Sequence, residues 1–218
     1  SLSVDTLSRT ADALLIKLSP EGRELWRLVQ SGVANGPNAS LFKVDEDGSV
    51  FLASLLARGE SSSDLVTEWE VSKINSTGKV LWRVVLPNVG YLLASDSRAS
   101  RMLSFTDHGD LLLVGTYAAN PFPSPSTRTS TSGFAAQVSS KGNVQWWTTD
   151  YKGNIAPYGF ASVGVDRTGR VCASGSGSGL TVFSKSGKAL YTSDLGGIVV
   201  GPTFDGDFLL RTASYLYT

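Results

Sequence analysis

The chain has 218 residues, of which 41% are hydrophobic and 17% are charged, so it can bury the core of one large domain or two small ones. Nineteen basic residues balance nineteen acidic ones, which gives no electrostatic reason to expect a nucleic acid or an anionic membrane as partner. No apolar run approaches the roughly 20 residues that span a bilayer, and the single cysteine, Cys172, excludes an internal disulfide.

The first predicted element is a β-hairpin over residues 13–28. Two apolar runs flank the turn Ser19-Pro20-Glu21-Gly22, in which proline presets the backbone and glycine accepts the positive φ that closes the turn. Trp26 follows Gly22 by four residues. The same spacing recurs three times along the chain, and we call these four units the Trp hairpins: Gly22 with Trp26, Gly78 with Trp82, Gly142 with Trp146, and Gly187 with Tyr191.

A second type of hairpin lies between the Trp hairpins, and we call these units the Asp hairpins. The first covers residues 41–53, with Asp45 opening its turn and Gly48 closing it. Two further copies turn at Gly109 and Gly169, and a degraded copy turns at Gly206. Their return strands are apolar at almost every position, which predicts strands covered on both faces.

The two hairpin types alternate without exception, and this alternation predicts the fold. One Asp hairpin followed by one Trp hairpin makes a four-stranded antiparallel meander, which is the blade of a β-propeller. We expect one all-β domain over residues 1–218, with four blades in a ring that the N- and C-terminal hairpins close together. The alternative is an arc of a larger propeller. The expected blades cover residues 41–86, 102–149, 161–195, and 198–218 combined with 11–30.

The repeat positions have predicted structural roles. The glycines close turns, and the large rings fill the wedge where neighbouring blades diverge. These structural positions are Gly22, Trp26, Gly48, Gly78, Trp82, Gly109, Gly142, Trp146, Gly169, Gly187 and Tyr191.

Two segments carry a resemblance to known repeats. Residues 12–26 and 44–53 resemble the SBBP-type β-propeller repeat. They are also similar to the PQQ-like repeat, in which a docking tryptophan follows a glycine by four residues. The resemblance covers nearly the whole chain in eight half-repeats. It implies an extracellular or cell-surface propeller that serves adhesion or assembly, often as one module of a larger bacterial-type protein.

The sequence contains few of the residue patterns that catalytic sites require. Quinoprotein dehydrogenases share the PQQ-like repeat, but they often carry a vicinal cysteine pair, which the single Cys172 excludes. A Ser-His-Asp relay would have to use His108, which lies in a polar turn, and no nucleophile elbow is present. One histidine and one cysteine are too few for a zinc site. We therefore expect no enzyme activity, no cofactor and no metal.

Two local patterns leave alternatives open. The turn containing Asp45 and Asp47 crowds carboxylates as calcium loops do, but the pattern stops after two aspartates, so Asx-turn capping by Asp45 is favoured over calcium. Asn38 and Asn75 begin glycosylation sequons in predicted loops, which makes a glycoprotein one interpretation.

Five aromatic residues are not required by the hairpin pattern, and they are the candidate binding residues. Exposed rings near loops can anchor a protein partner or stack on a sugar. Burial between blades is the competing interpretation. The five residues are Trp69, Tyr91, Trp147, Tyr151 and Tyr158.

The function predicted from these features is a non-catalytic binding or structural module of a cell-surface or extracellular assembly. Its expected partners are proteins, with a glycan as a further candidate ligand and no membrane insertion. The alternative is a carbohydrate-active propeller, either a lectin or a glycoside hydrolase. That alternative requires two or three acidic side chains to converge in the channel beside an exposed ring. An intracellular scaffold is a third hypothesis, which the free cysteine does not oppose.

Overall fold

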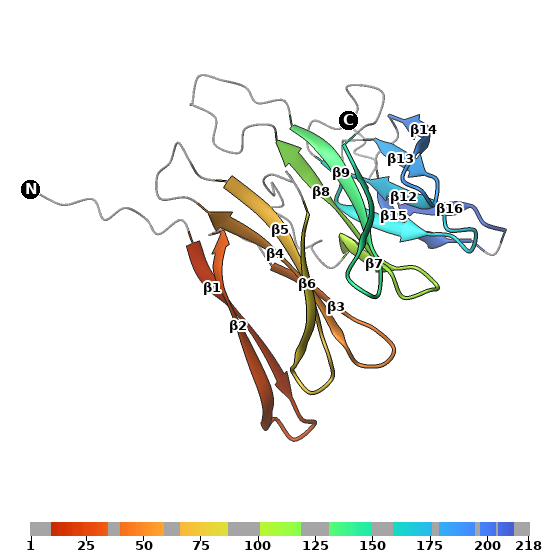
Figure 1. Cartoon of the computed structure of the whole chain (residues 1–218). Helices are drawn as coiled ribbons and strands as arrows, with labels where there is room; N and C mark the ends of the chain where they lie inside the picture. The colour runs from red at the N-terminus through yellow and green to blue at the C-terminus, as the bar shows by residue number, and fades with distance from the viewer. Residues whose placement is uncertain are drawn as a thin grey trace, which may run out of the picture.

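The computed structural model describes residues 10–34, 40–58, 66–86, 101–118, 131–149, 159–175, 179–194, 197–203 and 205–211 (Figure 1). The regular elements in these ranges are β-strands, and all their pairings are antiparallel. These ranges contain no helix with the length and hydropathy to cross a membrane. The all-β prediction is confirmed.

An Asp hairpin and the following Trp hairpin form one sheet three times, as the alternation predicts; the second and third sheets are four-stranded, and the first is part of a six-stranded sheet. The first sheet contains β3 (Ser40–Val44), β4 (Val50–Arg58), β5 (Val66–Ile74) and β6 (Val80–Leu86). The second contains β7 (Leu103–Phe105), β8 (Leu111–Ala118), β9 (Thr131–Val138) and β10 (Val144–Thr148). The third contains β11 (Ser162–Val165), β12 (Val171–Ser174), β13 (Leu180–Phe183) and β14 (Ala189–Ser193).

The two remaining hairpins do not pair with each other in the described residues, so the predicted fourth sheet of residues 198–218 and 11–30 is not seen. They are β1 (Thr10–Leu18) with β2 (Glu24–Ala34), and β15 (Ile198–Pro202) with β16 (Phe208–Arg211). Figure 1 shows them at opposite ends of a row of sheets, with β15 beside β11 and β12. Closure into a four-bladed ring is not confirmed.

Unequal strand lengths explain where the first hairpin attaches. β3 pairs with β4 only as far as Ser54, so the edge of β4 beyond that residue is open to another strand. β2 takes this place, because Val33 pairs with Leu56. The first hairpin therefore extends the first sheet instead of closing a ring.

A continuous apolar core runs through the row of sheets. β8 is buried at every position from Leu111 to Thr116, which is the coverage of both faces that its unbroken apolar sequence predicts. Ring contacts lie where neighbouring sheets meet: Phe51 of β4 meets Phe105 of β7 at 5.0 Å between centroids, and Phe160, whose N–H donates to the carbonyl of Gly115 in β8, meets Phe183 of β13 at 6.2 Å. Both contacts have edge-to-face geometry, the arrangement that aromatic quadrupoles favour.

Turn chemistry follows one rule in both hairpin types. The first turn residue accepts a hydrogen bond, through its side-chain oxygen, from the backbone N–H four residues ahead. In the Trp hairpins this residue is Ser19, Asn75, Ser139 or Ser184. In the Asp hairpins it is Asp45, Thr106, Asp166 or Thr203.

Candidate functional site

The tryptophans of the Trp hairpins form a repeated docking contact. The indole N–H of Trp26 donates to the carbonyl of Ser76 at 3.1 Å, and that of Trp82 donates to the carbonyl of Ser140 at 3.1 Å. Trp146 donates to the carbonyl of Lys185 at 3.0 Å. In each case the ring of one Trp hairpin lies on the turn of the next one along the chain. We call these three contacts the docking series.

The turn position that each indole ring contacts must be a glycine. A Cβ atom on Gly78 would lie 2.7 Å from Trp26, and one on Gly142 would lie 2.7 Å from Trp82. A Cβ atom on Gly187 would lie 2.6 Å from Trp146. All three glycines also have positive φ, between 80° and 88°, which side-chain-bearing residues rarely adopt. The glycine-to-tryptophan spacing therefore encodes both partners of the docking series.

A groove of about 600 Å³ crosses the first strands of successive Asp hairpins. One position of the repeat lines it in every Asp hairpin, namely the residue two places before the first turn residue. These residues are Lys43 of β3, Ser104 of β7, Gly164 of β11 and Gly201 of β15. We call this hollow the first-strand groove, and it combines apolar valines with charged side chains.

The charge of the first-strand groove is unbalanced. Lys43, Arg101 and Arg211 line it, whereas Asp107 is the acidic residue of the lining. The Lys43 ammonium donates to the carbonyl of Leu103 at 3.2 Å and lies over the Phe105 ring, and burial lowers its pKa. Arg101 and Arg211 are exposed and form no ion pair with any residue the structure describes. The groove is thus suited to an anionic ligand.

The predicted binding aromatics do not gather in this groove. Trp69 lies on β5 with none of its surface exposed, so it is a core residue, as the competing interpretation of burial holds, and not a surface anchor. Its indole N–H has no partner among the described residues. Trp147 is partly buried against the same core. Tyr91, Tyr151 and Tyr158 lie outside the described residues, and their binding role stays a prediction.

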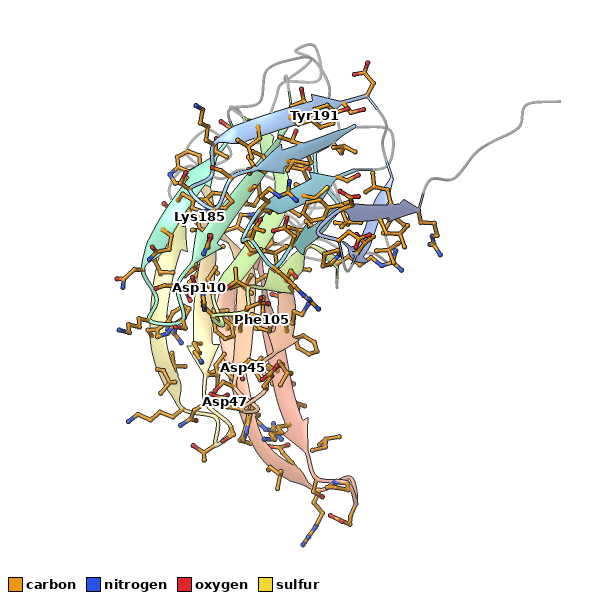
Figure 2. All side chains as sticks on the ribbon, turned by 90° about the vertical axis from the view of Figure 1, so that its right-hand side faces the viewer. Asp45, Asp47, Phe105, Asp110, Lys185 and Tyr191 are labelled. Atoms are coloured by element: carbon orange, nitrogen blue, oxygen red, sulfur yellow. The ribbon has the colours of Figure 1, made fainter. Side chains whose placement is uncertain are left out.

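The carboxylates of the first Asp hairpin are held by donors from the protein. Asp45 and Asp47 each accept the N–H of Ser49 at 2.8 Å, and the Lys73 ammonium lies 3.1 Å from Asp45 (Figure 2). Hydrogen bonds involving Asp45 and Ser49 hold the pKa of Asp47 well below its ordinary value. The arrangement favours Asx-turn capping, because a lysine already occupies the place where a cation would neutralise Asp45.

The remaining reactive residues are not assembled into a site. His108 lies exposed in its turn, where its backbone N–H donates to Thr106. Cys172 is 1% exposed on β12, and burial raises the pKa of its thiol to about 12. Within the described ranges no three residues of the types His, Cys, Asp and Glu cluster as metal ligands would.

The sequence pattern that singled out exposed aromatic residues did not indicate the cationic residues of the groove. The repeat could have indicated Lys43, because this residue occupies the repeat position that lines the groove in all four Asp hairpins. Arg101 and Arg211 carry no such signal, because Arg101 precedes β7 and Arg211 ends β16, and neither occupies that repeated position.

Comparisons with known proteins identify no close relative. No protein-family model matches the chain. No curated protein matches it either. Among solved structures, the chain is similar to the crystal structure of BamB from Moraxella catarrhalis, with 11% identity over 91% of this chain and 73% of that chain, and a TM-score of 0.29. A similarity of this size assigns neither a family nor a function.

Proposed function

We propose that this protein is a non-catalytic module that binds a protein partner within a larger assembly at the cell surface or outside the cell. In this proposal its four-stranded sheets are blades of a β-propeller. The observation that carries it is the first-strand groove, which gathers three cations and one carboxylate in a chain whose net charge is zero.

The groove's lining suggests what part of a partner it takes. Val163, Val165 and Val199 supply apolar surface between the cationic side chains. A peptide segment that alternates acidic and aliphatic residues matches both features, since arginine pairs well with carboxylates and valine with aliphatic groups. Exposed charges such as Arg101 and Arg211 steer such a segment by electrostatic attraction. The partner is therefore expected to present an acidic, partly aliphatic segment.

Fluorescence anisotropy with labelled peptides tests this proposal. The probes are ten-residue peptides of alternating Glu and Val, and matched peptides with Gln in place of Glu. We expect the acidic peptide to bind at low ionic strength, and the variant Arg101→Glu/Arg211→Glu to bind it at least about tenfold more weakly. The matched control is Lys79→Glu/Lys188→Glu, which makes the same charge change on two exposed turns outside the groove.

Two results would contradict the proposal. One is equal binding of the acidic and the neutral peptide by the unchanged protein. The other is an equal loss of binding in the groove variant and in the control variant, because that would show a response to net charge alone.

The carbohydrate-active alternative gains no support from the groove. That function requires acidic side chains to converge beside an exposed ring, with two carboxyl groups placed across a glycosidic bond in a hydrolase. Among the residues that line the groove, Asp107 alone is acidic, and the nearby ring of Phe105 lies under Lys43. The protein-binding function is therefore preferred.

A further inference from the structure

The docking series is open at both ends. Tyr191 occupies the position of the three docking tryptophans, but its side chain is 58% exposed and rests on no described turn. Gly22 occupies the position of the three receiving glycines and shares their positive φ of 82°, but nothing lies within 4 Å of the place where its Cβ would be. The exposed Tyr191 ring and the uncovered turn at Gly22 are therefore complementary halves of one docking contact.

The strand edges are open in the same way. In each four-stranded sheet the second strand of the Asp hairpin pairs with the first strand of the following Trp hairpin, as β4 with β5, β8 with β9, and β12 with β13. The second strand of the last Asp hairpin, β16, pairs with β15 alone among the described strands. β1 in turn pairs with β2 alone among the described strands. Within that part of the chain, the edge that is paired in the three sheets is thus free on β16, and the corresponding partner edge is free on β1.

Exposed apolar side chains gather at the same two ends. Elsewhere in the described ranges the large hydrophobic residues with high exposure are Phe42, Val44 and Leu81. At the first hairpin and at the β14–β16 end they are Leu14, Ile16, Leu18, Leu25, Val29, Leu190, Tyr191, Val200 and Leu209. Surfaces of this kind on a folded domain mark interaction sites.

We propose that a second copy of this chain docks head to tail on these ends. β16 of one copy pairs with β1 of the other, so that β15, β16, β1 and β2 complete a four-stranded sheet between two molecules. The ring of Tyr191 then lies on the turn at Gly22, and its hydroxyl can donate to the carbonyl of Pro20, the position that accepts the indole N–H in the docking series. Such a contact joins two different surfaces, so copies close into a ring when the rotation allows it.

A second copy fits better than the chain's own other end. Figure 1 shows the β1–β2 hairpin and the β15–β16 hairpin at opposite ends of the row, and Figure 2 shows Tyr191 far from the β1–β2 hairpin. β2 is also held to β4 through Val33 and Leu56. The ring contact itself uses Tyr191 and Gly22, which do not line the first-strand groove, so variants at these two positions test the contact separately from the proposed function.

Sedimentation equilibrium of single-residue variants measures the strength of the contact. We expect the wild-type chain to associate into particles of at least twice its 23.1 kDa, and Tyr191→Ala to weaken this association at least about tenfold. Tyr191→Trp should strengthen it, because tryptophan is the residue that docks at the other three positions. The matched control is Phe42→Ala, which removes an equally exposed ring from a strand away from both ends and should leave the association unchanged.

Photo-cross-linking identifies the surface that receives the ring. A benzophenone amino acid replaces Tyr191 in one copy, and this copy is mixed with an isotope-labelled wild-type copy. We expect mass spectrometry to find cross-links from position 191 to residues 19–22 of the labelled copy. A monomeric wild-type chain at all concentrations would overturn the proposal, and so would cross-links to residues 19–22 within the same copy, which would show a ring closed by one chain.

Discussion

Gly78, Gly142 and Gly187 meet two requirements at once: each has a positive φ, and each leaves the space in which an indole ring lies. Gly109 meets the first requirement alone, because its φ is 75° and nothing lies within 4 Å of a Cβ placed on it. The pair Gly142 and Gly109 therefore separates the cost of backbone strain from the cost of displacing a ring.

We predict that Gly109→Ala lowers the free energy of unfolding by about 1–2 kcal/mol, the cost of a side chain in the left-handed region. Gly142→Ala should lower it by a further 1–3 kcal/mol or so, because the added methyl group collides with the Trp82 ring. Urea unfolding followed by tryptophan fluorescence measures both values. Equal losses in the two variants would mean that the ring does not dock on Gly142.

Asp166 gives the stability a defined dependence on pH. Burial of its carboxylate raises the pKa, but hydrogen bonds from Thr168 and Arg170 outweigh this effect, so the pKa lies below its ordinary value. A lowered pKa stabilises the fold above the unfolded-state pKa of about 4, and this stabilisation is lost as the pH falls through the folded-state value. Unfolding free energies measured between pH 6 and pH 2.5 should therefore fall less steeply for Asp166→Asn than for the wild type. Parallel curves would contradict this assignment.

Cys172 should be inert in the folded protein. It is 1% exposed, and burial raises the pKa of its thiol to about 12, so the reactive thiolate is scarce at neutral pH. We expect no reaction with a thiol-reactive chromogenic disulfide at pH 8 until denaturant unfolds the chain, after which one thiol per chain reacts. Rapid labelling without denaturant would show that β12 opens or is exposed.

At the scale of the hairpin, each of the first three Trp hairpins pairs its own two strands and docks its ring on the turn of the next Trp hairpin. Trp82 of β6 packs against Phe51 in the first sheet and donates to Ser140 in the turn of the second sheet. This hairpin therefore supplies two strands to the first sheet and also holds the first and second sheets together through Trp82. Its neighbour Leu81 points away and is 50% exposed, which makes it a matched control on the same strand.

We predict that Trp82→Phe costs about 1 kcal/mol or more, because it removes the indole hydrogen bond to Ser140 and keeps an aromatic ring. Trp82→Ala should cost about 3 kcal/mol, because it also leaves a cavity between the two sheets. Leu81→Ala should stay within about 0.5 kcal/mol of the wild type. Chemical unfolding measures the free energy of unfolding of all three variants. A loss for Leu81→Ala as large as for Trp82→Ala would show that Trp82 has no special role in holding the two sheets together.

Hairpins and their turns were predictable because local rules specify them: turn glycines, capping oxygens and apolar strands all lie within a few residues of one another. The attachment of β2 to β4 was not predictable, since it depends on β3 ending at Ser54 of its partner. Trp69 shows the same limit at the candidate site, because the sequence did not distinguish a buried ring from an exposed one. The cationic residues Arg101 and Arg211 line the same groove only because separate sheets pack together, which local sequence patterns do not specify.

At the scale of the whole molecule, the six-stranded first sheet, two four-stranded sheets and the β15–β16 hairpin stand in a row, and the β1–β2 hairpin forms the outer end of the first sheet (Figure 1). Each sheet covers the next, which explains why β8 is buried from Leu111 to Thr116. The two end units have no following sheet among the described residues, and there the apolar side chains remain exposed. Among the described residues the row is therefore open, with its two end hairpins apart.

Pulsed electron-electron spin resonance on a doubly labelled chain tests this claim most directly. Spin labels attached at Arg23→Cys and Asp207→Cys mark the turns of the first and last hairpins, Cys172 is replaced by alanine, and excess unlabelled chain ensures that each distance is measured within one molecule. An open row predicts a long separation, well beyond that of the matched pair Arg23→Cys and Thr77→Cys, whose turns the docking series joins. A separation as short as that of the matched pair would show a ring closed by one chain, and would contradict the account.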